Sequence, residues 1–287
     1  MRFLSLQSHV AYGYVGNRAA TFPLQRLGHE VWAVNTVEFS NHTGYGAWRG
    51  RTAPAGQVAD IVAGIEALGL LSRCDALLTG YVGDAALGDV VLDTARKVRA
   101  ANARAVWCCD PVLGDIDTGI YVKPGIDSFF RERAIPAADL VTPNHFELEH
   151  LTGARVSTMN EALAAARSLL AKGGEGPRLA LITSLRRADA PADQIEMVAV
   201  AADAAWRVTT PLIGFEIAPN GTGDMVAALF SAYWIETGDA AAALGKAASS
   251  VYAVLEATQA MGERELQLVA AQDRLIAPPR RFTAEKL

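Results

Sequence analysis

The chain has 287 residues, of which 51% are hydrophobic and 20% charged, the composition of a globular protein that can bury a large core. Its formal net charge of −5, from 26 basic and 31 acidic residues, gives no reason to expect a nucleic-acid partner. No run of about 18 apolar residues predicts a membrane helix, and the apolar N-terminal stretch is too short for a signal peptide, so we expect a cytoplasmic protein without a membrane partner.

Apolar runs of the strand type alternate with helical patterns along the chain. Strands are predicted at residues 3–7, 30–37, 76–79, 105–109 and 179–182, a further short strand is predicted to end with residues 140–141, and an antiparallel pair is predicted at 196–200 and 206–209. Helices are predicted at residues 17–27, 57–68, 87–101, 161–172, 223–236 and 240–260. Pro23 should lie near a kink or a start of the first helix. Loop composition marks residues 173–177 and 188–194.

The repeated strand-then-helix units predict an α/β fold. We expect one domain over residues 1–287, with a doubly wound, mostly parallel sheet and helices on both faces. The strand at 105–109 is apolar throughout, as expected for a strand covered on both sides. Within this strand the adjacent residues Cys108 and Cys109 point to opposite faces of the sheet. The three cysteines of the chain are therefore expected to form no disulfide framework and to be small buried hydrophobic residues.

Polar segments follow the predicted strands, at the edge where an open α/β sheet binds its ligands. These segments are residues 8–9 with 13–17, then 39–46, 79–83, 110–115 and 142–147. Each of them alone predicts only a loop with a turn or capping residue. Together they predict one binding crevice.

The segment Asn-Gly-Thr-Gly-Asp at residues 220–224 precedes an apolar run of helical composition. Its glycines allow a backbone to approach a ligand closely, and amides at a helix start favour an anion. A carboxylate beside such a site suits a base that takes the proton of a hydroxyl attacking a phosphoryl group, so the segment predicts a small-molecule kinase. The alternative is a glycine turn in which Asp224 is a helix N-cap or first-turn acid.

These motifs resemble those of bacterial pyridoxal kinases in the ribokinase-like superfamily. The matching segments are Gln-Ser-His at 7–9, Phe-Ser-Asn-His-Thr-Gly-Tyr at 39–45, Gly-Tyr-Val-Gly at 80–83, Asp-Pro-Val at 110–112, Thr-Pro-Asn at 142–144 with Glu147, Gly-Thr-Gly-Asp at 221–224, and residues 266–273. Gly-x-Gly-Asp marks only the superfamily. The first two segments are similar to those of the branch that phosphorylates the vitamin B6 ring.

The resemblance implies a role for each part of the crevice. Asp224 would receive the proton of the 5′-hydroxymethyl group, while the amides of Gly221, Thr222 and Gly223 hold the γ-phosphate. The residues implied to contact the pyridine ring are Ser8, Thr43 and the backbone of Gly44, through hydrogen bonds, and His42 and Tyr81, through packing.

The resemblance also implies a metal ion and a nucleotide. Asp110 and Glu147 suit a Mg²⁺ ion that keeps most of its water and is shared with ATP phosphates. The resemblance is also compatible with a monovalent cation such as K⁺ as a second cofactor. The positions that match nucleotide-contacting residues of relatives are Asp110, Thr142, Asn144, Glu147, Thr183, Thr210, Pro211, Leu212 and Ile213.

The chain departs from relatives in two ways. Some relatives have a lysine after the strand at 179–182, where this chain has Thr183 and Ser184. A second kind of pyridoxal kinase, closer to hydroxymethylpyrimidine kinases, has a reactive cysteine over the ring, but no cysteine lies near residues 221–224. A covalent hemithioacetal with the aldehyde is therefore not expected.

The leading hypothesis is ATP-dependent phosphorylation of pyridoxal to pyridoxal 5′-phosphate. The rival substrates are pyridoxamine, pyridoxine and a hydroxymethylpyrimidine. The hypothesis of another class is a non-catalytic carrier of vitamin B6, but a carrier needs no base beside a phosphate site. The family usually forms homodimers, so the resemblance implies one here.

Overall fold

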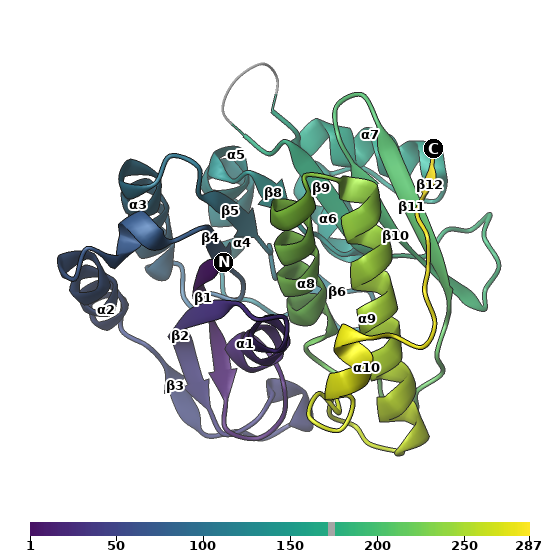
Figure 1. Cartoon of the computed structure of the whole chain (residues 1–287), viewed down its shortest axis with the longest axis horizontal. Helices are drawn as coiled ribbons and strands as arrows, with labels where there is room; N and C mark the ends of the chain where they lie inside the picture. Colours follow the sequence, from purple (N-terminus) through teal and green to yellow (C-terminus); the bar gives the residue numbers. More distant parts are fainter. Residues whose placement is uncertain (172–175) are drawn as a thin grey trace.

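A ten-stranded sheet runs through the computed structural model, which describes residues 1–171 and 176–287 (Figure 1). Its strands are β1 (Arg2–Val10), β2 (Glu30–Phe39), β3 (Gly50–Thr52), β4 (Ala76–Thr79), β5 (Val106–Cys109), β8 (Leu140–Val141), β9 (Leu179–Leu185), β10 (Gln194–Val200), β11 (Ala205–Pro211) and β12 (Glu285–Lys286). The order is β12-β11-β10-β9-β8-β5-β4-β1-β2-β3. A separate hairpin joins β6 (Gly114–Asp115) to β7 (Gly119–Ile120).

The centre of the sheet is parallel and its two edges are antiparallel. All neighbours from β2 through β1, β4, β5 and β8 to β9 pair in parallel. β3 is antiparallel to β2, and β10, β11 and β12 extend the other edge in antiparallel register. The predicted mostly parallel sheet with an antiparallel extension is therefore confirmed.

Helices cover both faces of this sheet (Figure 1). One layer contains α1 (Asn17–Arg26), α8 (Thr222–Thr237), α9 (Ala240–Ala260) and α10 (Gln272–Ile276). The other contains α2 (Ala55–Ala67), α3 (Leu87–Ala101), α4 (Ile126–Phe129), α5 (Ile135–Ala137), α6 (His145–Thr152) and α7 (Met159–Leu169), with a π-helical turn at Phe130–Ala134 between α4 and α5. No helix within residues 1–171 or 176–287 is long and apolar enough to cross a membrane.

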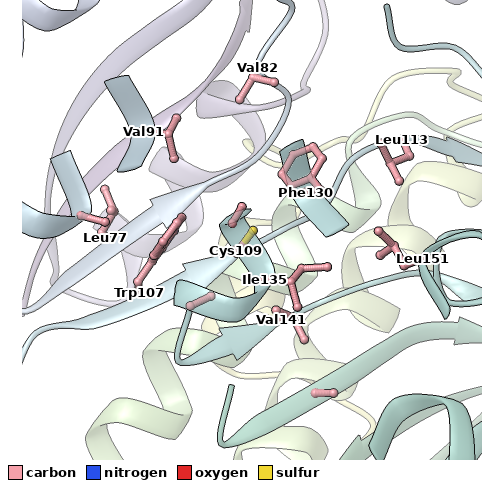
Figure 2. Close-up of a cluster of buried hydrophobic side chains, with 14 of the residues drawn as sticks. Leu77, Val82, Val91, Trp107, Cys109, Leu113, Phe130, Ile135, Val141 and Leu151 are labelled. Atoms are coloured by element: carbon pink, nitrogen blue, oxygen red, sulfur yellow. The ribbon is translucent and has the colours of Figure 1, made fainter. Parts of the chain in front are cut away.

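Strand alternation divides the core between the two faces. On β5, Trp107 and Cys109 belong to the hydrophobic cluster under α2 to α7, which Figure 2 shows, whereas Cys108 belongs to the cluster under α8 and α9. All three cysteines are buried and free, as expected. Because helices cover both faces of the central strands, we expect a ligand to bind at the ends of the strands.

Most predicted elements are confirmed, with changes at their ends. The strand at 76–79 and the helices at 87–101 and 240–260 match to the residue, and the short strand predicted to end with residues 140–141 is β8, which ends at Val141. Pro23 lies inside α1 rather than at its start. The helix predicted at 161–172 is α7, which begins at Met159 and ends at Leu169; Lys172 and the first three residues of the loop predicted at 173–177 lie outside the described residues.

The strand predicted at 179–182 continues to Leu185, because β10 pairs with it as far as that residue. Thr183 and Ser184 therefore lie within β9 and not after it. In the same way β11 continues to Pro211, paired with Gln194, so Thr210 and Pro211 belong to a strand. Strand ends set by a partner strand carry little signal in the local sequence.

Candidate active site

A cavity of about 530 Å³ opens at the carboxyl ends of the parallel strands. The predicted site residues that line it are Ser8, His42, Thr43, Tyr81, Asp110, Thr142, Asn144, Glu147, Thr183, Gly221, Thr222, Gly223 and Asp224. The structure thus brings together residues that lie within or just after six strands, β1, β2, β4, β5, β8 and β9, and residues at the start of α8, as expected for a doubly wound sheet. Its volume is in the range of ordinary small-molecule sites.

Five predicted residues do not line this cavity: Gly44, Thr210, Pro211, Leu212 and Ile213. Gly44 is exposed, and its backbone groups are already engaged, because its N–H donates to His42 Nδ1 and its carbonyl accepts from Arg264. The segment at 210–213 ends the antiparallel strand β11 and its continuation, where the Leu212 N–H donates to the carbonyl of Asp193.

Helix α8 begins at the Gly-Thr-Gly-Asp segment. Its N-cap is Gly221, in the left-handed region at φ 82°, so Asp224 is not the N-cap and lies instead in the first turn. Its carboxylate points away from its own helix: Oδ2 accepts a 2.8 Å hydrogen bond from the N–H of Gly16, in the loop before α1. The amides at the helix start have no intrahelical acceptor, and Gly221, Thr222 and Gly223 line the cavity, which suits an anion site.

Two glycines make this close contact possible. Gly16 has φ 53°, and a Cβ there would overlap the carbonyl of Ser8. A Cβ on Gly221 would overlap the carbonyl of Tyr14. The loop at 13–16 and the start of α8 therefore pack backbone to backbone, which fixes the position of the Asp224 carboxylate.

Burial raises the pKa of Asp224 to about 6, and the hydrogen bond from Gly16 opposes part of that rise. A carboxylate with such a pKa is ionised at neutral pH but is more basic than an exposed one. That balance suits a general base.

Asp110 and Glu147 lie deep in the cavity wall, at 4% and 3% exposure. Asp110 Oδ1 accepts a hydrogen bond of 2.9 Å from the hydroxyl of Thr142. Glu147 accepts backbone N–H bonds of 2.9 Å at each oxygen, from Leu113 and Asn144. Burial raises the pKa of both carboxyls, Glu147 to about 8, and the neighbouring Glu147 and Asp224 charges raise that of Asp110 further.

Glu147 also has a local structural role, which the sequence analysis missed. Asn144 is the N-cap of α6, and Glu147 completes a capping box with it. The Asn-x-x-Glu spacing before a helix was available as a signal. The residue therefore holds α6 and the loop at Leu113 in place while its carboxylate faces the cavity.

The cavity is also lined by Ser8, Tyr81 and Thr43, the first residue of a short 3₁₀ helix, η1 (Thr43–Tyr45). His42 caps η1, since its Nδ1 accepts the Gly44 N–H at 3.1 Å. Burial lowers the pKa of His42, so its imidazole is neutral at pH 7 with the proton on Nε2. Burial likewise raises the pKa of the Tyr81 hydroxyl, which stays protonated.

Sequence reasoning also missed Lys123, which lines the cavity and pairs with Asp84 at 3.1 Å. Among the described residues, no lysine or arginine other than Lys123 lines this cavity. Thr183 and Ser184 place no positive charge on β9. The apolar walls that Trp48 and Tyr121 form were missed as well. None of these residues stands in a motif with a fixed spacing.

The family model described as phosphomethylpyrimidine kinase matches residues 57–268. Pyridoxal kinase PdxY of Rubrobacter xylanophilus is 55% identical over 288 residues, which cover 100% of this chain and 98% of that protein. Pyridoxal kinase PdxY of Deinococcus radiodurans is 50% identical over 285 residues, 99% of this chain and 96% of that protein. The chain belongs to the pyridoxal kinase family. The resemblance is confirmed, and with it a phosphotransferase that acts on an alcohol group.

Solved structures show the same fold for this kinase. Pyridoxal kinase from Leishmania donovani in complex with ADP and ginkgotoxin is 32% identical and superposes with a TM-score of 0.91 over 100% of this chain and 99% of that chain. The same enzyme in complex with ADP and pyridoxamine gives 0.90 with the same identity and coverage. The doubly wound α/β fold is therefore confirmed at full length.

Proposed function

We propose that this protein transfers the γ-phosphoryl group of ATP to the 5′-hydroxymethyl group of pyridoxal, giving pyridoxal 5′-phosphate. The observation that carries the proposal is Asp224, a base with a pKa of about 6 that Gly16 holds beside the amides at the start of α8. A carrier would gain nothing from a carboxylate placed against its own anion site, since the charges repel.

The residues of the chain suggest how the transfer proceeds. The ionised Asp224 takes the proton of the hydroxymethyl group as its oxygen attacks the γ-phosphorus. The amides of Gly221, Thr222 and Gly223 face the charge that develops on the phosphoryl oxygens, and the positive end of α8 adds to their effect. Ser8 and Thr43 hydrogen-bond the polar edge of the ring, between His42 and Tyr81, so that the hydroxyl lies beside the base.

The donors in the cavity fit a magnesium ion. Asp110 and Glu147 are carboxylates, and two buried negative charges side by side are costly unless a cation offsets them. No group of three or more His, Cys, Asp or Glu side chains within the described ranges could hold a metal by itself, which suits an ion that takes its other ligands from water and phosphate. When bound, Mg²⁺ neutralises phosphate charge and aligns the transferred group. A monovalent cation such as K⁺ belongs to the same proposal.

The nucleotide part extends from these carboxylates along the strand ends. We assign its contacts to Thr142, Asn144 and Thr183, which line the cavity, and to the segment at 210–213, which lies beyond it. We further propose that the whole chain is one domain, since β1 at its start and β12 at its end belong to the same ten-stranded sheet. We also propose a cytoplasmic location and a homodimer.

An assay of ATP consumption coupled to product detection tests the proposal. Purified protein with Mg-ATP is compared on pyridoxal, pyridoxine, pyridoxamine and hydroxymethylpyrimidine, and pyridoxal should turn over faster than the pyrimidine. The reverse order would move the protein to a different branch of kinases. Binding of a vitamer without any ADP formation would favour the carrier instead.

A further inference from the structure

The loop between α9 and α10, near the C-terminal end of the chain, contacts two segments that border the cavity, at Tyr14 and at Gly44 and Tyr45. Leu266 and Leu268 anchor it, fully buried in the cluster formed with α8 and α9. The N–H of Gln267 donates to the hydroxyl of Thr258 on α9, which fixes the loop further. Glu265, next to these anchors, is only 5% exposed.

The Glu265 carboxylate joins two segments that are distant from it in sequence. Oε1 accepts a hydrogen bond of 2.7 Å from the hydroxyl of Tyr45, and Oε2 accepts one of 3.0 Å from the N–H of Tyr14. A Cβ on Gly13 would overlap this carboxylate, and Gly13 has φ 93°, so the close approach depends on glycine there. A buried carboxylate with both oxygens used is held in one position.

Each of the two partners leads directly into the active site. Tyr45 ends η1, whose residue Thr43 and cap His42 line the cavity. Tyr14 lies two residues before Gly16, which donates to Asp224, and the Tyr14 carbonyl packs against Gly221. One side chain thus connects the segment that meets the ring with the loop that holds the base.

Among the described residues, the other side chains that hold η1 are Tyr12, whose ring meets the Tyr45 ring edge-on with 6.1 Å between centroids, and Arg264. None of its residues is buried, and Gly46, Ala47 and Trp48 after it are exposed. Arg264 adds a second contact, with its guanidinium carbon 3.7 Å from the centre of the Tyr45 ring and Nη2 donating to the Gly44 carbonyl at 2.8 Å. A segment with so few buried contacts moves readily unless such bonds hold it.

We propose that Glu265 is a positioning residue of the kinase reaction. Through Tyr45 and Tyr14 it holds the ring-binding segment at 42–45 and the loop at 13–16 in fixed relation, so that the substrate hydroxyl meets Asp224. The inference rests on the proposed function, since it concerns the same site. Glu265 does not line the cavity and acts only through its two partners.

Three variants separate its contacts. Glu265→Ala removes both hydrogen bonds, while Tyr45→Phe removes only the one to the ring-binding segment. Glu265→Gln preserves both, because its amide oxygen accepts from the Tyr14 N–H and its amide nitrogen donates to the Tyr45 hydroxyl oxygen. Asp139→Ala is the matched control: Asp139 accepts the Trp107 N–H at 2.8 Å and pairs with Arg99, and it lies just before β8, at the amino-terminal end of the parallel strands.

KM for pyridoxal, KM for ATP, kcat and melting temperature are measured for all four and for the wild type. Loss of a hydrogen bond to a charged group should raise KM for pyridoxal about tenfold in Glu265→Ala and Tyr45→Phe, with KM for ATP within about twofold of wild type. Only Glu265→Ala should also lower kcat, since only it releases Tyr14. Glu265→Gln should stay near wild type, and Asp139→Ala should lower the melting temperature without changing either KM.

An unchanged KM for pyridoxal in Tyr45→Phe and Glu265→Ala would overturn the proposal. So would an equal increase in KM for pyridoxal and KM for ATP, or a Glu265→Gln variant with the same kinetic defects as Glu265→Ala. If Glu265→Ala fails to fold, the Tyr45→Phe comparison still decides, because it alters a partly exposed residue. A wild type that does not phosphorylate pyridoxal would contradict the proposed function instead. In that case, the Kd for pyridoxal measured by calorimetry for the wild type and the same variants decides the role of Glu265.

Discussion

Asp224 differs from an ordinary first-turn acid in where its carboxylate points. An acid in that position usually interacts with the free amides of its own helix. Here the carboxylate accepts from Gly16 in another segment, which leaves the amides at the start of α8 available for an anion. The proposed base and the proposed anion site are therefore neighbours, while the carboxylate is hydrogen-bonded to Gly16 and not to the amides of its own helix.

Replacing Asp224 by asparagine should separate catalysis from structure. The asparagine oxygen still accepts the Gly16 N–H, so folding is retained, but the side chain no longer takes a proton. We expect kcat to fall about 10² to 10⁴-fold. ATP affinity should stay the same or increase, since a negative charge facing the γ-phosphate is removed. Measuring kcat, ATP Kd and melting temperature on one preparation checks this; a variant that keeps most of its turnover would exclude the catalytic role.

The pH profile gives a second check on the same residue. Asp224 accepts a proton only when ionised, and burial raises its pKa to about 6. The value of kcat/KM for pyridoxal should therefore fall as pH decreases through about 6 and level off above it. The measurement is kcat/KM between about pH 5 and 8 at saturating Mg-ATP, with Asp224→Asn in parallel. The residual activity of that variant should lack the inflection, and a wild-type profile that is flat over this range would contradict the assignment.

At the level of elements, α8 has a left-handed glycine at each end, and the two serve different purposes. Gly238, the C-cap, has φ 65°, and a Cβ added there would meet no atom within 4 Å. Gly221, the N-cap, has φ 82° and no room for a Cβ beside Tyr14. Only the second glycine brings two segments of the active site together.

Alanine at these two positions should therefore act differently. Gly238→Ala carries only the cost of a left-handed alanine, about 1 kcal/mol, and kcat should be unchanged. Gly221→Ala must also push the loop at 13–16 away from α8, which displaces the Asp224 carboxylate. A displacement of about 1 Å lowers turnover about 10²-fold. Thermal unfolding and kcat of both variants check the prediction, and equal kcat in the two would show that the close contact has no role in turnover.

Elements with strong local patterns could be predicted from the sequence, and those defined by distant partners could not. Helix α3 and helix α9 carry long apolar periodicities, and both were predicted to the residue. The end of β9 depends on its pairing with β10, so the local sequence did not show that Thr183 lies inside a strand. Helix α6, with only eight residues, was missed although its capping box was readable.

On the scale of the whole molecule, the parallel order of the sheet decides which motifs meet. Six separate polar segments predicted one crevice because parallel strands end at the same edge, and the cavity lies there. Glu265 escaped prediction because its partner Tyr45 is 220 residues away along the chain, and no local pattern indicates such a pairing. Local motifs therefore predicted the groups that we propose to react, whereas the residue that we propose to hold them in place is found only in the tertiary structure.

The crowding of acids in the cavity should also affect the stability of the whole protein. The pKa values of Asp110, Glu147 and Asp224 are raised in the folded state, so that state binds more protons than the unfolded chain. The stability these groups contribute is fully present below their unfolded pKa, near 4, and is lost as pH rises through the folded values, about 6 for Asp224 and about 8 for Glu147. Without ligand, the charged cluster therefore opposes folding at pH 8.

The variant Asp110→Asn isolates this effect, because asparagine still accepts the Thr142 hydroxyl but carries no charge. His29 and His42, whose pKa values burial lowers, change stability with the opposite sign near pH 6, and they cancel in the difference between variant and wild type. We expect Asp110→Asn to be more stable than wild type at pH 8, with a melting temperature higher by about 2 to 4 °C for each kcal/mol of added unfolding free energy. This difference in melting temperature should decrease toward pH 5.

Millimolar Mg²⁺ alone should stabilise the wild type more than Asp110→Asn, since only the wild type keeps both carboxylates. Thermal unfolding of wild type and variant at pH 5 and pH 8, with and without Mg²⁺, measures the difference in stability under all four conditions. A wild type more stable than Asp110→Asn at pH 8 without metal would show that the Asp110 charge is already neutralised within the protein, and the carboxylate pair would then have no need of a cation.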